Sequence, residues 1–145
     1  MYLFLTVHGM FNNSDKYVII EGRDPSVTVS LLLCTMYIVG KAPSVPDGHE
    51  LKNVHVVAPD IIELQCQIDL GNPTAQVRWY RNKRHSMMFS DITNDSRYVI
   101  KTDAEMQSLI IPKSHTSDSA TYRCEAINKF GKVRTVCRVA VLRKF

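Results

Sequence analysis

The sequence SDSATYRC, residues 117–124, places an acid, a small residue, a tyrosine and a cysteine at every second position. Successive side chains of a β-strand point to opposite faces, so this rhythm predicts a strand with these four residues on one face. They are Asp118, Ala120, Tyr122 and Cys124. The stretch alone is compatible with a catalytic role or an architectural one, and the neighbouring sequence must separate the two.

Residues 41–145 consist mainly of short runs in which apolar and polar side chains alternate. The runs are NVHVV (53–57), IIELQCQI (61–68), QVRWYR (76–81), RYVIKT (97–102), SLIIP (108–112), ATYRCEAI (120–127) and VRTVCRVAVL (133–142). Turn formers separate them, as in SDITNDS (90–96), and no convincing amphipathic helix interrupts them. Short alternating strands between frequent turns predict an all-β sandwich or barrel.

Two cysteines and one tryptophan favour the sandwich. Cys66 and Cys124 lie on the inward faces of two predicted strands, and Trp79 is on the inward face of a third. The inner faces of two packed sheets lie about 10 Å apart, so residues of both sheets must meet across that gap. The order Cys, Trp, Cys resembles the immunoglobulin sandwich, in which a tryptophan packs on two facing cysteines.

Residues 41–145 resemble an immunoglobulin domain of the I-set, a two-sheet Greek-key sandwich. The segments that carry the resemblance are LKNVHVV (51–57) for strand A′, IELQC (62–66) for strand B, VRWYR (77–81) for strand C and SLIIPKSHTSDSATYRCEAINKFG (108–131) for strands E and F. Asn128 and Gly131 fit the family's A-x-N-x-x-G pattern. Three positions depart from the family's usual residues, namely Pro59, Ser114 and Ala120.

The resemblance implies a structural core of six residues: Cys66, Trp79, Leu109, Asp118, Tyr122 and Cys124. Tyr122 would form a tyrosine corner, its hydroxyl bonding back to nearby backbone. Asp118 would lie in the turn before that strand and satisfy local donors or an arginine. The resemblance therefore assigns the rhythm of the opening stretch to architecture.

Residues 101–133 look most like modules of giant muscle proteins, the titin, twitchin and obscurin group. This likeness implies a non-enzymatic structural and protein-interaction module of a multi-domain cytoskeletal protein, cytoplasmic and sarcomeric. Its partners would be other proteins and neighbouring immunoglobulin or fibronectin-type modules, and the strand at 133–142 would offer its edge to a partner strand. A regulatory module beside a kinase or exchange-factor domain is a less favoured alternative.

The rival interpretation is an extracellular adhesion or receptor domain. It would carry a Cys66–Cys124 disulfide and an N-glycan at Asn94, which begins the sequon NDS. A membrane association follows only from this alternative. The family includes intracellular members with reduced cysteines, so the sequence leaves the redox state open.

Signatures of catalysis and of cofactor or metal binding are missing from the sequence. It contains no G-x-S-x-G elbow, no phosphate-binding glycine loop and no H-E-x-x-H motif, and its five histidines lack metal-ligand spacing. His115, Ser117 and Asp118 could be arranged as an acid–base set, but solvated turn residues are the favoured interpretation. Cys137 alternates inward and is expected to be a small core residue.

The formal net charge of the 145-residue chain is +4, and residues 41–145 carry sixteen basic and eleven acidic groups. The basic stretch RWYRNKRH suggests a partner patch of four residues: Arg78, Arg81, Lys83 and Arg84. A solvated strand and turn is the favoured interpretation, followed by a surface for an acidic protein. Nucleic acid is disfavoured, because Trp79 is committed to the core and only Tyr80 remains for stacking.

Residues 1–40 are expected to be an irregular N-terminal extension or part of a neighbouring domain. The apolar run at 27–39, VTVSLLLCTMYIV, is shorter than the roughly 20 residues that span a bilayer. A buried strand pair is favoured over a signal-anchor, and an artefactual gene start is a further alternative. We therefore leave this segment unassigned and place the I-set domain at 41–145.

Overall fold

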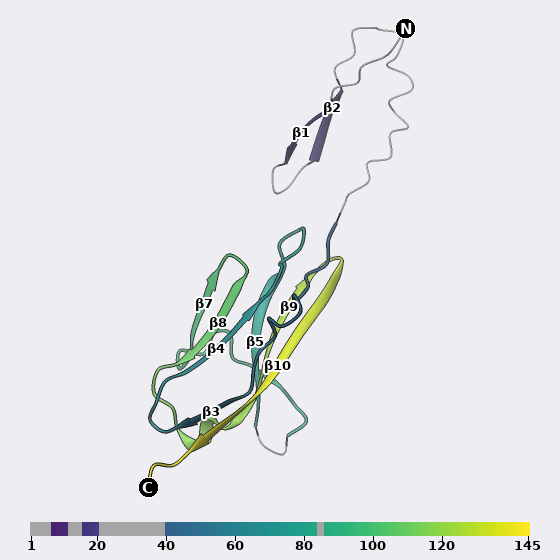
Figure 1. Cartoon of the computed structure of the whole chain (residues 1–145). Helices are drawn as coiled ribbons and strands as arrows, with labels where there is room; N and C mark the ends of the chain where they lie inside the picture. Colours follow the sequence, from purple (N-terminus) through teal and green to yellow (C-terminus); the bar gives the residue numbers. More distant parts are fainter. Residues whose placement is uncertain (1–6, 12–15, 21–39, 84–85) are drawn as a thin grey trace, which may run out of the picture. The chain divides into compact units, whose positions relative to one another are not determined.

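The computed structural model describes residues 7–11, 16–20, 40–83 and 86–145 (Figure 1). The chain divides into two units, Met1–Ile38 and Val39–Phe145. In the first unit, β1 (Val7–Phe11) and β2 (Lys16–Ile20) form an antiparallel pair. The apolar run at 27–39, for which a buried strand pair is the favoured expectation, lies outside the described residues.

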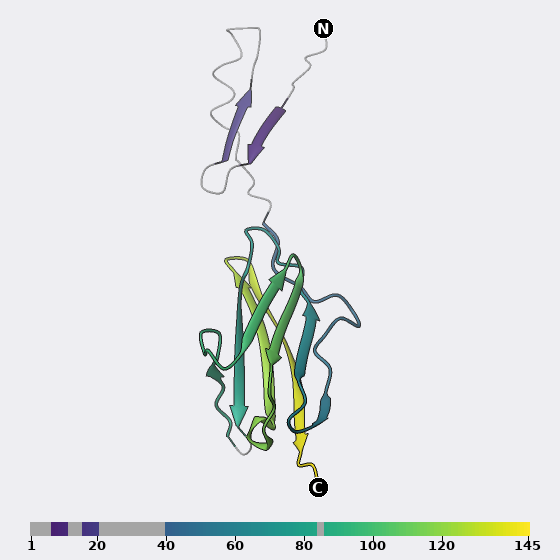
Figure 2. The same cartoon turned by 90° about the vertical axis from the view of Figure 1, so that its left-hand side faces the viewer.

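The second unit is a sandwich of two β-sheets (Figures 1 and 2). The five-stranded sheet has the order β3 (Val54–Val57), β10 (Gly131–Leu142), β9 (Ala120–Asn128), β5 (Gln76–Lys83), β6 (Ser90–Asp91). The three-stranded sheet has the order β4 (Ile62–Gln67), β8 (Met106–Ile111), β7 (Val99–Asp103). Neighbouring strands are antiparallel except β3 and β10, which run parallel. The predicted all-β two-sheet sandwich is confirmed.

Strand β6 was not expected from the sequence, because it falls in the stretch of turn formers at 90–96. Its two residues pair with the outer edge of β5, Asp91 opposite Tyr80 and Ser90 opposite Arg81. A pairing this short is decided by the neighbouring strand and not by local preference. A short 3-10 helix, η3 (Thr116–Asp118), precedes β9.

The core lies between the sheets and follows the predicted alternation. Along β4 every second side chain is buried, and the same holds along β9 as far as Ala126. The largest fully buried side chain is Trp79, and Leu109 of β8 is also completely buried. Ser114, at a position that is apolar in the I-set pattern, is buried with its hydroxyl unpaired.

Candidate functional site

The centre of the sandwich is built from Trp79 and two cysteines on facing sheets. Cys66 belongs to β4 of the three-stranded sheet, whereas Cys124 belongs to β9 of the five-stranded sheet. Trp79 lies directly opposite Cys124 in the pairing of β5 with β9. The indole and Cys124 have no exposed area, and Cys66 has 2%. These residues therefore connect the two sheets and have no access to a substrate in solvent.

The cysteine thiols of this core are enclosed and poorly suited to nucleophilic chemistry. Cys66, Cys124 and Cys137 are free and buried in this structure. A hydrogen bond with Cys66, together with burial, holds the pKa of Cys124 far above its usual value. Burial raises the pKa of Cys137 to about 12. A protonated, enclosed thiol is a poor nucleophile, so Cys124 and Cys137 lack the character of a catalytic cysteine, and Cys66 is enclosed in the same core.

Tyr122 and Asp118 form the corner at which the chain enters β9. The Tyr122 hydroxyl donates to the Asp118 carbonyl at 3.0 Å, which is the tyrosine corner predicted from the sequence. Burial raises the pKa of Tyr122, so the hydroxyl stays protonated and able to donate. The Asp118 side chain is fully buried, with Oδ1 2.6 Å from Arg97 Nη2 and Oδ2 accepting the His115 N–H at 2.7 Å.

The contacts of Asp118 exclude the acid–base set imagined from the sequence. Its carboxylate is occupied by Arg97 and by the backbone of the turn, and solvent does not reach it. The expectation of a solvated Asp118 is therefore wrong, because the ion pair and the turn N–H replace water. His115 and Ser117 are exposed, as expected.

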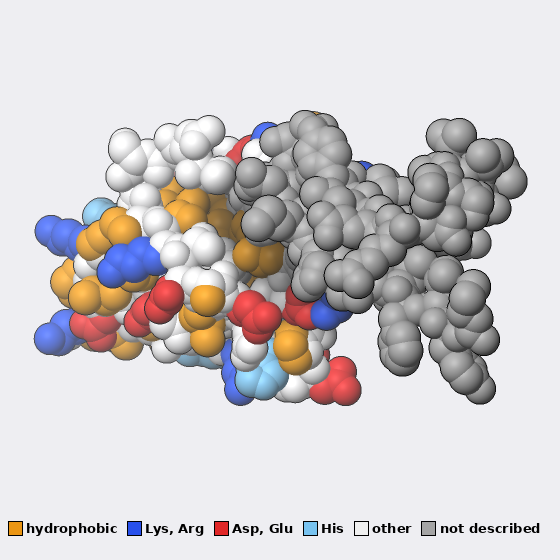
Figure 3. Space-filling view, turned by 90° about the horizontal axis from the view of Figure 1, so that it is seen from above, with side chains coloured by type: hydrophobic (Ala, Val, Ile, Leu, Met, Phe, Trp, Pro, Cys, Tyr) orange, Lys and Arg blue, Asp and Glu red, His pale blue; other side chains and the backbone are white. Residues whose placement is uncertain are grey.

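Within the described ranges, no group of three or more His, Cys, Asp or Glu side chains is arranged to hold a metal ion. No helix in that same part of the chain is long and apolar enough to cross a bilayer. Acidic, basic and apolar side chains are interspersed on the face turned toward the viewer in Figure 3.

The predicted basic patch does not gather on one face of β5. Arg78 is exposed and pairs with Asp91 at 3.0 Å. Arg81 is on the same side of β5 as Trp79, opposite to Arg78. Its guanidinium donates to the Ser117 carbonyl and lies 5.9 Å from the centroid of the Tyr122 ring. Lys83 is exposed at the end of the strand. Arg84 lies outside the described residues.

Cross-strand register assembles a different basic surface. Residues opposite one another in a ladder point to the same side of the sheet. On the outer side of the five-stranded sheet, β5, β9 and β10 thereby form three rows: Arg78, Glu125, Arg134; Tyr80, Arg123, Val136; and Asn82, Thr121, Arg138. We call this surface the basic face. Three of its four arginines, Arg123, Arg134 and Arg138, were not expected from the sequence, although they alternate with inward-facing residues.

Arg123 is held rigidly at the centre of the basic face. Its guanidinium lies 4.4 Å from the centroid of the Tyr80 ring and 4.3 Å from that of Phe89. Its Nε is 3.9 Å from the Glu125 carboxylate, and only 17% of the side chain is exposed. Cation–π contacts on two sides fix the arginine and cover both aromatic rings.

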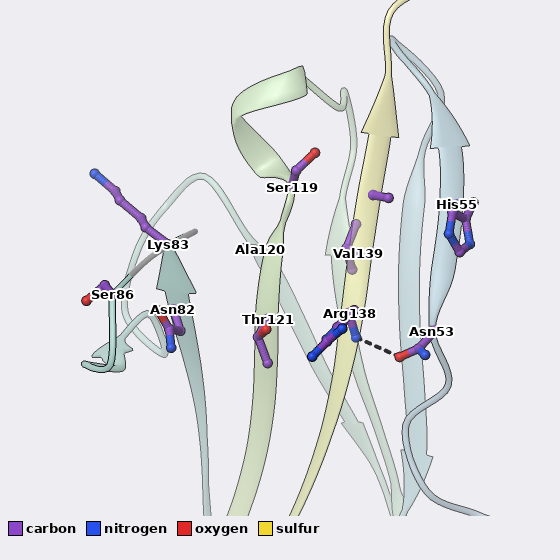
Figure 4. Close-up of a pocket in the computed structure, with 11 residues that line it drawn as sticks. Asn53, His55, Asn82, Lys83, Ser86, Ser119, Ala120, Thr121, Arg138 and Val139 are labelled. Carbon is purple, nitrogen blue, oxygen red and sulfur yellow. Dashed lines mark hydrogen bonds between the residues drawn. The ribbon is translucent and has the colours of Figure 1, made fainter.

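A groove of about 550 Å³ opens at one end of the basic face (Figure 4). Figure 4 shows its lining on β5, β9, β10 and the β3 segment. The residues are Asn53, His55, Asn82, Lys83, Ser86, Ser119, Ala120, Thr121, Arg138, Val139 and Ala140. The Asn53 side-chain oxygen accepts the Arg138 backbone N–H at 2.8 Å and ties β10 to the segment before β3. None of the eleven lining residues is acidic.

Two facing sheets around a tryptophan, a tyrosine corner and a parallel pairing of β3 with β10 define an immunoglobulin-type domain. Residues 48–141 match the sequence model of the immunoglobulin I-set domain. The chain belongs to the immunoglobulin I-set family.

The relatives include muscle proteins and proteins of other kinds. The chain is 33% identical over 96 residues to the titin homolog of Caenorhabditis elegans, covering 65% of this chain and a share of that protein that rounds to 0%. It is 32% identical over 97 residues to human hemicentin-1, covering 67% of this chain and 2% of hemicentin-1. The chain thus spans a very small part of these relatives.

Solved structures agree with the fold. A chain of the crystal structure of the titin M10–obscurin-like 1 Ig complex superposes with a TM-score of 0.62 at 24% identity. The likeness covers 73% of this chain and 99% of that chain.

Proposed function

We propose that this chain is a non-enzymatic structural and protein-interaction module of a multi-domain muscle cytoskeletal protein, located in the sarcomere. The observation that carries the proposal is that the groups fit for chemistry, the three described cysteines and Asp118, are buried in structural contacts. The domain exposes a sheet face and strand edges to solvent, and such surfaces can bind other proteins. Similarity to the titin homolog supports the muscle assignment.

Strand β10 supports the docking of a partner strand. Its last residues, Val139–Leu142, pair with β3, whereas over Gly131–Arg138 the pairing is with β9 alone among the described strands. Arg138 directs its N–H to Asn53, so the unpaired edge lies N-terminal to it. An edge with free N–H and C=O groups is the usual acceptor in strand addition. A chain of the crystal structure of the titin M10–obscurin-like 1 Ig complex shares this fold, which supports a role in binding proteins.

Localisation in muscle tests the assignment. The chain carrying a fluorescent tag would be expressed in differentiating muscle cells and imaged together with a sarcomeric marker. We expect a periodic striated pattern. A diffuse cytoplasmic signal or release into the medium would contradict the sarcomeric function.

The second candidate is an extracellular adhesion or receptor domain, favoured by similarity to hemicentin-1. Cys66 and Cys124 lie on facing sheets, as a bridge between sheets requires. Asn94 is exposed in the turn between β6 and β7, where a glycan would meet no packed neighbour. Intact mass measured before and after alkylation and glycosidase treatment separates the candidates. With alkylation in denaturant and no reductant, alkylation of all four cysteines and no glycan support the muscle module. Alkylation of only two cysteines, a mass lower by two hydrogens before alkylation and a glycan support the rival.

A further inference from the structure

We propose that the groove of the basic face binds an extended acidic segment of a partner protein. This inference rests on the proposed function as an interaction module and adds the chemistry of one partner. It concerns a surface separate from the edge of β10, because the groove crosses the strands and does not extend a sheet.

Positive charge is neutralised unevenly over the basic face and its groove. Arg78 is paired with Asp91 at 3.0 Å, and Arg134 lies 4.0 Å from Glu125. Two exposed cations line the groove: Arg138 on the basic face, and Lys83 at the end of β5, which is outside the three rows of that face. Neither has an ion-pair partner among the acidic residues of the described ranges. A hollow lined by unpaired cations and no carboxylate attracts negative charge.

The groove also contains neutral side chains that can form hydrogen bonds. Asn82 and Thr121 lie one beside the other in the ladder, next to Arg138, and Ser86 closes the side beyond β5. These side chains can bond the peptide groups of a bound segment, while the cations bind its carboxylates. Asn53 already accepts the Arg138 N–H, so the strand that carries this arginine is fixed before a partner arrives.

The groove continues into a second one. A second groove of about 540 Å³ shares Lys83, Ser119 and Ala140 with the first. It adds Arg81 and Leu142 and again contains no acidic residue. The two grooves together offer a path longer than a single side chain, which suits an extended segment.

Nucleic acid fits this surface less well. Single strands bind to proteins by combining a cationic groove with aromatic rings on which bases stack. No aromatic ring lines either groove except the imidazole of His55. The nearest candidates on the basic face, Tyr80 and Phe89, are both covered by Arg123.

The test is a titration of a fluorescently labelled, synthetic Glu-rich peptide with the full chain. Binding is measured by fluorescence anisotropy at low and at physiological salt. A Lys-rich peptide of equal length and a single-stranded oligonucleotide serve as comparison ligands. The groove variant is Lys83→Glu with Arg138→Glu. The matched control is Lys101→Glu with Lys113→Glu, at two exposed lysines, on β7 and just after β8. Both double variants lower the formal net charge of +4 by the same four units.

We expect the Glu-rich peptide to bind the wild-type chain, and the groove variant to bind it at least about tenfold more weakly, because like charges are now juxtaposed. The control should change the affinity less than about twofold, since its charges are remote and screened. Thermal melting of each variant verifies that the fold persists.

Equal weakening in the two variants would overturn the proposal, because it would show attraction by net charge alone. It would also be overturned by absence of binding to the wild-type chain or by tighter binding of the oligonucleotide. None of these results would contradict the proposal that the chain is a sarcomeric module, which the localisation experiment tests separately. Conversely, a failed localisation with intact groove binding would remove the sarcomeric function and leave the acidic ligand.

Discussion

Replacing Trp79 by alanine removes the largest fully buried side chain of the sandwich. The indole lies between the sheets beside Cys124, so the neighbouring strands cannot close on the space without shifting. Deletion of a buried tryptophan costs about 3–5 kcal/mol, against a total stability of about 5–15 kcal/mol for a domain. At about 4–8 °C per kcal/mol for a small domain, the melting temperature should fall by roughly 12–40 °C. We therefore expect the substitution to remove a large part of the domain's stability and to lower its melting temperature toward body temperature.

Circular dichroism melts and urea denaturation would measure this effect. The matched control is Ile127→Ala on β9, where 45% of the side chain is exposed and the loss should stay below about 1 kcal/mol. Trp79→Phe should lie between the two, because it keeps a ring and gives up an indole N–H that has no hydrogen-bond partner. If Trp79→Ala melts within a few degrees of Ile127→Ala, the indole does not hold the sheets together and the reasoning is refuted.

Three further predictions concern the corner and the buried thiol. Tyr122→Phe should lose about 1 kcal/mol in urea denaturation, because the 3.0 Å hydrogen bond to the Asp118 carbonyl disappears. Asp118→Ala should lose more, about 1–3 kcal/mol, since Arg97 and the His115 N–H both lose their partner; a smaller loss than that of Tyr122→Phe would argue against this ranking. Burial raises the pKa of Cys137 from its ordinary value of 9.0 to about 12. The buried neutral thiol therefore contributes to the free energy of unfolding in full below pH 9, and this contribution is lost as the pH rises toward 12. Urea denaturation at pH 8 and pH 10.5 should show that Cys137→Ala flattens this decline, and an unchanged slope would contradict it.

The fold was predictable because its main signal is local. The period of two in residues 61–68 and 120–127 fixes which side chains face inward, and burial along β4 and β9 follows it. Strand β6 escaped prediction for the opposite reason: its two residues have no strand pattern of their own and are placed by β5. Asp118 was placed correctly beside an arginine, but its burial depends on Arg97, 21 positions earlier, which the sequence does not single out.

The basic face shows why a surface is harder to predict than a core. Reading along one strand grouped Arg78 with Arg81, yet neighbouring positions with different parity point to opposite sides, and Arg81 is tied to the Ser117 carbonyl. The residue that actually shares a row with Arg78 is Arg134, 56 positions later, because both lie opposite Glu125. Core alternation is repeated on β4, β9 and β10 and tolerates an error in pairing, whereas a row across three strands changes completely with a register shift of one residue. Parity alone would have put Arg123, Arg134 and Arg138 on the outer side, and only the pairing shows which charges remain without a partner.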